Sequence, residues 1–209
     1  MHKDLIPHLE ALFDTYTDER HRSQVLKAKN EFFSITGAVN EDDDEFESRM
    51  NSFNEWYVFD FQDLDKEKTV VGEYIESNQL DSDLSQSLTE ANHSLFEFMK
   101  FNFRKQMVLK DYIHDRKIVL SKDQPKMSLL PDDIFVGRVL QYKNEYYLLN
   151  GICVVPKEVK SILKKQAKKV RRLRDPQKEL EFLLHLEALK LKWLRYGHVE
   201  SHKIFMFDV

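Results

Sequence analysis

Apolar residues in the first part of the chain recur with the period of a helix. Leu5, Leu9, Leu12 and Tyr16 are separated by four, three and four residues, which places them on one helical face. The next stretch keeps this spacing until Thr36-Gly37, where a glycine is typical of a helix end. The pattern predicts helices over residues 3–17, 19–35, 41–59, 69–77 and 82–92.

The period changes to two near residue 96. Phe96 and Phe98 alternate with Glu97 and Met99, as in a strand whose two faces differ. Later runs are rich in β-branched and aromatic residues, and Lys143-Asn144 has the form of a tight hairpin turn. Strands are expected over residues 96–103, 107–113, 117–120, 134–142 and 145–149.

Helical spacing returns after Pro156. One helix is expected over residues 157–174, and a second begins at Asp175-Pro176. Residues 180–194 are apolar around most of the helix circumference, which predicts a central packing helix or a homodimer contact. Residues 202–209 alternate enough to predict a closing strand.

These elements predict an α+β protein. We expect a mainly helical N-terminal region (1–95), a small antiparallel β unit (96–156) that forms an SH3-like barrel or sheet, and a C-terminal helical hairpin with its closing strand (157–209). The three regions can equally be parts of one integrated domain.

The composition supports a folded protein with long regular elements. Of 209 residues, 42% are hydrophobic and 33% charged, and the chain has only five Gly and five Pro. Its one cysteine, Cys153, lies in an apolar stretch and is expected in the core. The sequence shows no signal-peptide pattern and no apolar run approaching the roughly 18 residues of a membrane span, so we expect a cytoplasmic protein.

Charge is unevenly distributed along the chain. The net charge is only −4, but residues 157–174 hold nine Lys and Arg against one acid, Glu158, while residues 41–45 are all acidic. A basic helix of this kind binds an acidic protein surface, or, as the alternative, the phosphates of RNA or DNA. The expected binding residues are Lys157, Lys160, Lys164, Lys165, Lys168, Lys169, Arg171 and Arg172.

The segment Phe53-Asn-Glu-Trp-Tyr-Val-Phe-Asp60, with later anchors such as Gly137-Arg138 and Gly151, resembles an uncharacterised bacterial domain. Domains with this EWxxFD box often occur in proteins that end in a SEC-C zinc motif. The resemblance covers residues 50–165 and implies a helical front joined to a small β unit in a bacterial cytoplasm. One cysteine cannot supply the Cys-rich zinc site, so that role is not carried over. The matching motif positions are Glu55, Trp56, Asp60, Glu97, Asp111 and Arg138.

The carboxylates near Trp56 are candidates for acid–base chemistry, because burial beside an indole raises the pKa of a carboxyl group. We favour a different interpretation, in which Trp56 lies in the core and Glu55 and Asp60 cap the helix or form salt bridges. An enzyme would need Glu55, Asp60 and Asp111 to converge in one cleft.

Metal ligands are too few for a convincing site. His198 and His202 are four residues apart, and Cys153 would be a third ligand, but Gly197 interrupts the helix that would align the histidines. We therefore expect no metal, no cofactor and no catalytic residue. The sequence favours a non-enzymatic interaction or regulatory module.

Overall fold

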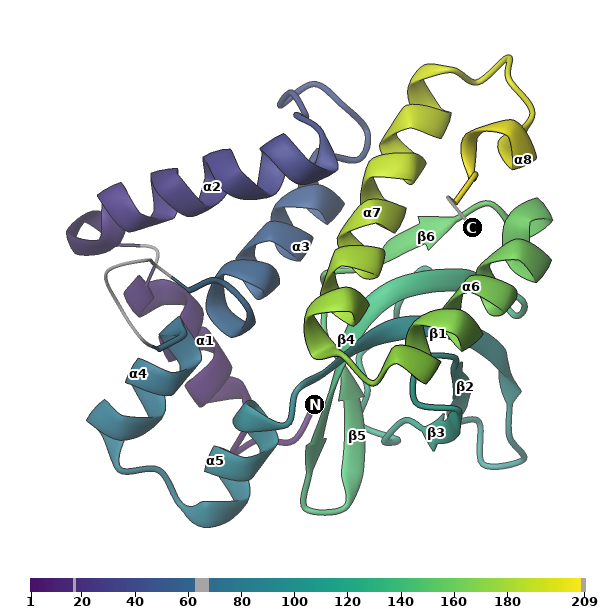
Figure 1. Cartoon of the computed structure of the whole chain (residues 1–209). Coiled ribbons are helices and arrows are strands. Elements are labelled where there is room, and N and C mark those ends of the chain that lie inside the picture. The colour runs from purple at the N-terminus through teal and green to yellow at the C-terminus, as the bar shows by residue number, and fades with distance from the viewer. Residues whose placement is uncertain (17, 63–67, 208–209) are drawn as a thin grey trace.

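The computed structural model describes residues 1–16, 18–62 and 68–207, and its N-terminal part is helical as predicted. The acidic run 41–45 precedes a helix rather than opening it, since that helix begins at Phe46. These helices lie together on one side of the molecule (Figure 1). They are α1 (Ile6–Tyr16), a 3₁₀ turn η1 (Glu19–His21), α2 (Arg22–Thr36), α3 (Phe46–Phe59), α4 (Val70–Asn78) and α5 (Ser82–Thr89).

Side-chain caps fix where the short helices start. Thr69 Oγ1 accepts a hydrogen bond from the Gly72 N–H at 3.3 Å, and Asp81 Oδ1 accepts one from the Leu84 N–H at 2.9 Å. Helix α5 ends at Thr89, three residues before the predicted end at residue 92, because the chain pairs as strand β1 from Asn92 on.

A six-stranded sheet follows, in the order β3-β2-β1-β4-β5, with β6 also paired to β4. Every pair of these strands is antiparallel. The predicted hairpin turn is present, with Lys143 and Asn144 both at positive φ (47° and 63°). The strands are β1 (Asn92–Phe101), β2 (Met107–Asp111), β3 (Arg116–Val119), β4 (Ile134–Tyr142), β5 (Glu145–Leu148) and β6 (Cys153–Val155).

The sheet curls until its two ends meet. Strands β5 and β6 pair with opposite halves of β4, and beyond β3 a bridge joins Leu120 to Tyr146 of β5. The Ser121 N–H donates to the Tyr146 carbonyl at 2.8 Å across this junction. The result is a curled half-barrel, which agrees with the predicted small barrel or sheet. Sequence periodicity missed β6, although it placed Cys153 correctly in the core.

The C-terminal part contains the predicted helical pair: η2 (Lys157–Val159) leading into α6 (Lys160–Leu173), and α7 (Pro176–Arg195). Asp175 caps α7 by accepting from the Gln177 N–H at 2.9 Å, and Pro176 occupies the first turn. The prediction of a closing strand over residues 202–209 is wrong for the residues that the structure describes, because a short helix, α8 (Ser201–Ile204), occurs there. Residues 208–209 lie outside the described part. No helix in the described ranges has the length and apolar character needed to cross a membrane.

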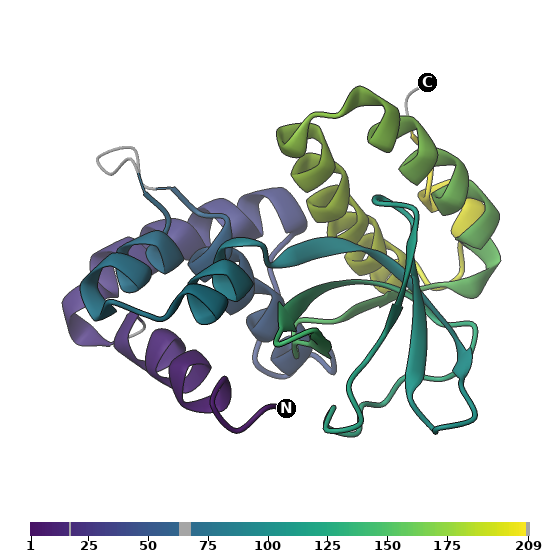
Figure 2. The ribbon, with the colours of Figure 1, turned by 90° about the horizontal axis from the view of Figure 1, so that it is seen from below.

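Helix α7 lies between the helical front and the sheet, and it packs against α2 as well as β6 (Figures 1 and 2). Its apolar residues, including Phe182, Leu186 and Leu191, are buried inside the chain itself. A homodimer through residues 180–194 was expected because this helix is apolar on most sides. Packing within one chain explains that apolar character, so we do not propose the dimer.

Two faces of the sheet carry different cores. One face packs under α6 and α7, with Leu95 and Val136 against Leu163, whereas the curled inner face holds Phe96 and Phe135. A third core fills the helical front and extends to sheet residues Leu140, Tyr142 and Tyr147. The boundary expected at 95/96 falls inside β1, so the regions 1–95 and 96–156 share a strand as well as a core.

Candidate functional site

The basic segment 157–174 lies over the sheet because one side of it is apolar. Val159, Leu163 and Ala167, spaced by four, are fully buried against the sheet and α7. The helix ends at Leu173, and the next residue, Arg174, adopts a left-handed conformation (φ 53°). The lysines and arginines are thereby divided between the flanks of α6 and its outer surface.

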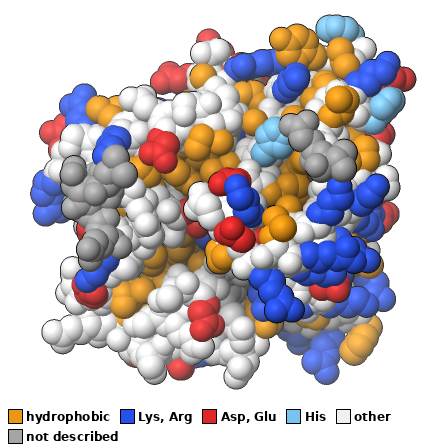
Figure 3. All heavy atoms as spheres, viewed as in Figure 1, with side chains coloured by type: hydrophobic (Ala, Val, Ile, Leu, Met, Phe, Trp, Pro, Cys, Tyr) orange, Lys and Arg blue, Asp and Glu red, His pale blue; other side chains and the backbone are white. Residues whose placement is uncertain are grey.

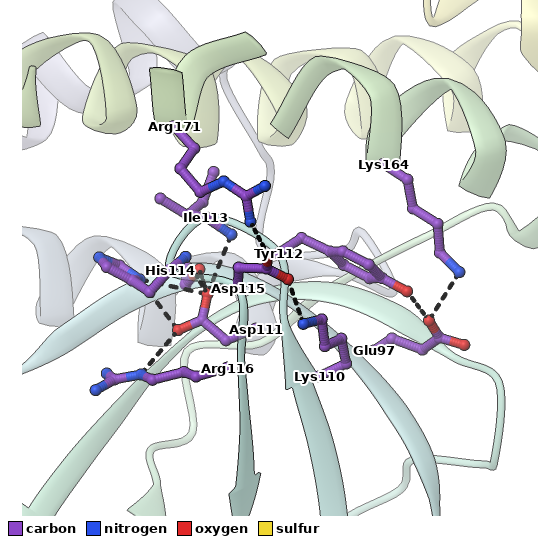
Figure 4. A network of polar contacts seen from close by, with 11 residues as sticks. Glu97, Lys110, Asp111, Tyr112, Ile113, His114, Asp115, Arg116, Lys164 and Arg171 are labelled. Atoms are coloured by element: carbon purple, nitrogen blue, oxygen red, sulfur yellow. Dashed lines mark hydrogen bonds and ion pairs between the residues drawn. The ribbon is translucent and has the colours of Figure 1, made fainter. Parts of the chain in front are cut away.

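Glu97 of β1 binds two of the predicted cations. The ammonium groups of Lys160 and Lys164 both form ion pairs with it, the second at 3.1 Å. The Tyr112 hydroxyl also donates to it, and Figure 4 shows Tyr112 and Lys164 on Glu97. Burial opposes ionisation of Glu97, but the hydrogen bonds from Lys160, Tyr112 and Lys164 hold its pKa below the ordinary value. Glu97, a motif position in the sequence, therefore anchors α6 on the sheet.

Further acids pair with both ends of the basic segment. Lys157 Nζ lies 3.1 Å from an Asp133 carboxylate oxygen, and Arg171 Nη1 lies 2.8 Å from an Asp115 oxygen. Figure 4 shows Arg171 reaching down from α6 to Asp115, which Lys110 also contacts. The cations expected to face a partner are thus partly neutralised by acids within the chain.

The remaining cations form an outer row on α6. Lys165, Lys168 and Arg172 are exposed at a spacing of three and four, with Lys169 and Arg174 beside them. None of these five has an acidic partner within the described ranges. Figure 3 shows the blue Lys and Arg side chains gathered on the side of the molecule where α6 lies. We call these five residues the outer row.

Asp111 is a buried carboxylate with an unusual number of donors. It accepts hydrogen bonds from Ser94 Oγ at 2.5 Å and Asn92 Nδ2 at 3.0 Å, and from the backbone N–H and the ring of His114. Burial disfavours its charge, yet the bonds from His114, Ser94 and Asn92 outweigh burial and hold its pKa well below the ordinary value. Arg116 adds a further contact at 3.4 Å (Figure 4).

Asp60, at the C-terminal end of α3, forms an ion pair with Arg138 of β4, so the predicted salt-bridge role is confirmed. The Arg138 guanidinium also lies 4.8 Å from the centre of the Phe59 ring. His93 is largely buried beside this pair, with Nδ1 3.7 Å from Asp60 Oδ2. Burial together with the Arg138 charge lowers the pKa of His93 well below 6.5, which favours the neutral imidazole.

A polar cavity of about 290 Å³ joins these groups, as Asp60, His93, Arg138, His114 and Arg116 all line it. Asp111 lies behind His114 and Arg116. Three of the six motif positions, Asp60, Asp111 and Arg138, thus come together here, while Glu97 binds α6.

Glu55 lies elsewhere and lines a different cavity. The hypothesis that the protein is an enzyme using these carboxylates required Glu55, Asp60 and Asp111 to share one cleft, and they do not. Glu55 accepts a hydrogen bond from the Gly151 N–H at 2.5 Å and is neither a cap nor a member of an ion pair among the described residues. Trp56 is in the core as predicted, and its buried Nε1 finds no acceptor in the part of the chain that is described.

The proposed metal ligands do not form a site. Cys153 is buried, and burial raises the pKa of its thiol to about 12, whereas His198 and His202 are exposed. The described ranges contain no group of three or more His, Cys, Asp or Glu side chains able to hold a metal ion.

A family model matches residues 8–181, which is most of the chain. The chain belongs to this family of unknown function (DUF7986). The family match agrees with the expectation of an uncharacterised family, but shows neither an EWxxFD box nor an association with SEC-C proteins. No curated protein and no solved structure matches the chain.

Sequence reasoning named Glu97 but missed that Glu97, Asp115 and Asp133 pair with the basic segment, and it missed the two histidines of the polar cavity. Glu97, Asp115 and Asp133 lie far from α6 in the sequence, so no local pattern connects them with it. His93 and His114 carry no motif spacing, and only the sheet brings them to one cavity.

Proposed function

We propose that this protein is a non-enzymatic interaction module that presents the outer row of α6 to an acidic surface of a partner protein. The observation that carries the proposal is the exposure of Lys165, Lys168 and Arg172 on α6 and of Arg174 just after it, with half-buried Lys169 beside them. None of the five has an acidic partner among the described residues. The internal ion pairs support it as well, because they fix α6 on the sheet and so present the outer row on a rigid support.

An exposed apolar residue favours a protein partner over a purely electrostatic one. Leu173 is 61% exposed between Arg172 and Arg174. Protein interfaces combine apolar contacts with a charged rim, whereas phosphate binding by a helix needs cations alone. The apolar part of such an interface keeps its affinity as salt rises.

RNA or DNA is a second candidate because of the hairpin between β1 and β2. Phe101 is 54% exposed and Phe103 is 92% exposed, and the same hairpin carries Lys100, Arg104 and Lys105. Exposed aromatic rings among cations are a stacking surface for unpaired bases. The sequence had shown no aromatic residues within the basic helix itself.

The test measures fluorescence anisotropy with three labelled probes: a Glu/Leu-rich acidic peptide, a single-stranded RNA and a duplex DNA, each at about 50 mM and about 200 mM salt. The variant reverses Lys165, Lys168, Lys169 and Arg172 to Glu. A matched control reverses four exposed lysines on other elements, at positions 3, 122, 126 and 192.

Three results together support the acidic-partner function. The wild-type protein binds the peptide at the higher salt, the α6 variant does not bind it, and the control variant does. RNA or DNA binding that falls steeply with salt and is weakened by Phe103→Ala would replace it with the second candidate. Absence of binding to every probe, or equal loss in the control, would overturn both.

A further inference from the structure

A cavity of about 350 Å³ opens between α1, α3 and the segment that follows β5, on a part of the molecule that the proposed function does not use. This volume is within the range of small-ligand pockets. The cavity is lined by Met1, Ile6, Leu9, Glu10, Phe13, Asp14, Asn51, Asn54, Glu55, Leu149 and Asn150.

The charged side chains around this cavity all have the same sign. Glu55 is 6% exposed, while Glu10 and Asp14 are exposed on α1 at its edge. Among the residues that the structure describes, no Lys, Arg or His side chain belongs to the lining. The amino group of Met1, which also borders the cavity, donates to the Asp123 carbonyl instead. The cavity is therefore complementary to a positive charge.

Glu55 is a buried carboxylate that forms no ion pair with a cation among the described residues. The Gly151 N–H donates to Oε1 at 2.5 Å, and Oε2 receives no hydrogen bond from a described residue. A carboxylate removed from water without a cation is costly, and burial raises the pKa of Glu55 to about 7 even though Arg138 acts in the opposite direction. The other charged groups that affect it, Glu187 and Asp60, are also acids.

The remaining lining sets the shape of the complementary ligand. Ile6, Leu9 and Leu149 give apolar walls, whereas the amides of Asn51 and Asn54 offer hydrogen bonds near Glu55. We propose that this cavity binds a primary ammonium group attached to a short apolar chain, with the ammonium on Glu55 and the chain along the apolar wall.

Two sources of this chemistry exist: a free alkylamine, and a lysine side chain of another protein. Isothermal titration calorimetry with pentylamine and with an acetylated, amidated lysine peptide separates them. Binding of either supports the site and identifies its source, and binding of neither at millimolar concentration would overturn it.

Pentanol and pentanoate test the charge requirement, since both keep the chain and lose the ammonium. Pentylamine should bind at least about tenfold more tightly than either, because the buried carboxylate gains its counter-charge only from the amine. Equal affinity for pentanol would show that the cavity recognises only the apolar chain and would reject the proposal.

Glu55→Gln keeps the acceptor for the Gly151 N–H and should weaken pentylamine binding by about tenfold or more. Glu179→Gln, which lies at the other cavity, is the matched control and should bind like the wild-type protein. Unchanged binding by a folded Glu55→Gln protein contradicts the proposal.

A measurement on the wild-type protein covers the case in which Glu55→Gln fails to fold. Below pH 7, an ammonium bound to Glu55 should displace its proton, so the binding heat should depend on the ionisation enthalpy of the buffer. Identical heats in phosphate and Bis-Tris at pH 6 would count against Glu55 as the binding group.

Discussion

Arg49 of α3 and Glu187 of α7 form a buried ion pair, with Nη1 and Oε2 2.6 Å apart and each side chain 3% exposed. Arg49 Nη2 also donates to Thr36 Oγ1 at 2.7 Å and to the Gly37 carbonyl at 2.9 Å, at the end of α2. One guanidinium therefore connects α2, α3 and α7.

Removing one partner of this pair should be far more harmful than removing both. Arg49→Met leaves the Glu187 carboxylate uncompensated in the core and should lower the free energy of unfolding by about 3–5 kcal/mol. The double variant Arg49→Met/Glu187→Leu should recover a large part of that loss in urea denaturation. If the double variant is no more stable than Arg49→Met, the loss of stability comes from the hydrogen bonds of Arg49 to α2 rather than from the ion pair.

A side chain at Gly151 would force the Glu55 carboxyl group to move, because a Cβ there would lie 2.7 Å from Glu55 Cδ. Gly151→Ala is expected to lower the free energy of unfolding by about 1–3 kcal/mol through overpacking. Gly197→Ala is the matched control, since the nearest atom to its Cβ, the Leu194 carbonyl oxygen, is 3.9 Å away. Similar stability losses in both variants would refute the close approach at Gly151.

The contribution of Glu55 to stability should fall as pH rises from about 5 to 8. Burial raises the pKa of Glu55 from 4.5 to about 7, so the folded protein holds a proton that the unfolded chain has already released. This stabilising effect is at most about 3 kcal/mol, is complete below pH 4.5 and is lost as pH rises through 7. His93, whose pKa is lowered, acts in the opposite direction in this range. Glu55→Gln should make the decline shallower in urea titrations across this range, and an unaltered slope would argue against its raised pKa.

Asp111 should stabilise the protein at neutral pH and lose this stabilising effect at low pH. Its pKa is held below 3.8 by its donors, so its contribution is present above that value and is lost as pH falls further. Asp111→Asn should cost about 2–4 kcal/mol at pH 7 and reduce the loss of stability on acidification below pH 4. His114→Ala, which removes one exposed donor, is the milder comparison.

Sequence reasoning succeeded where structure depends on neighbouring residues. Lys143-Asn144 is predicted as a tight turn between two strands, and both residues have the positive φ of such a turn; Asp175-Pro176 is predicted to start a helix, and α7 begins there. It failed at the C-terminus, where alternation over a few residues does not distinguish a strand from the short helix α8.

The candidate sites depended on contacts across the fold, which local patterns do not contain. The basic stripe was visible in the sequence, but which cations remain available follows from Glu97 and Asp115, in other elements. Likewise Glu55 could be named, but its missing counter-charge becomes evident only when Gly151 is seen beside it.

The position of α7 has a consequence for how the protein is made. Translation produces the helical front first, yet the packing of α2 against α7 and the ion pair of Arg49 form only when residues near Glu187 emerge from the ribosome. Until then the surface of α2 that α7 covers is exposed, and Arg49 has hydrogen bonds but no Glu187 counter-charge. Chaperone engagement during synthesis is thus expected to last until α7 has left the exit tunnel.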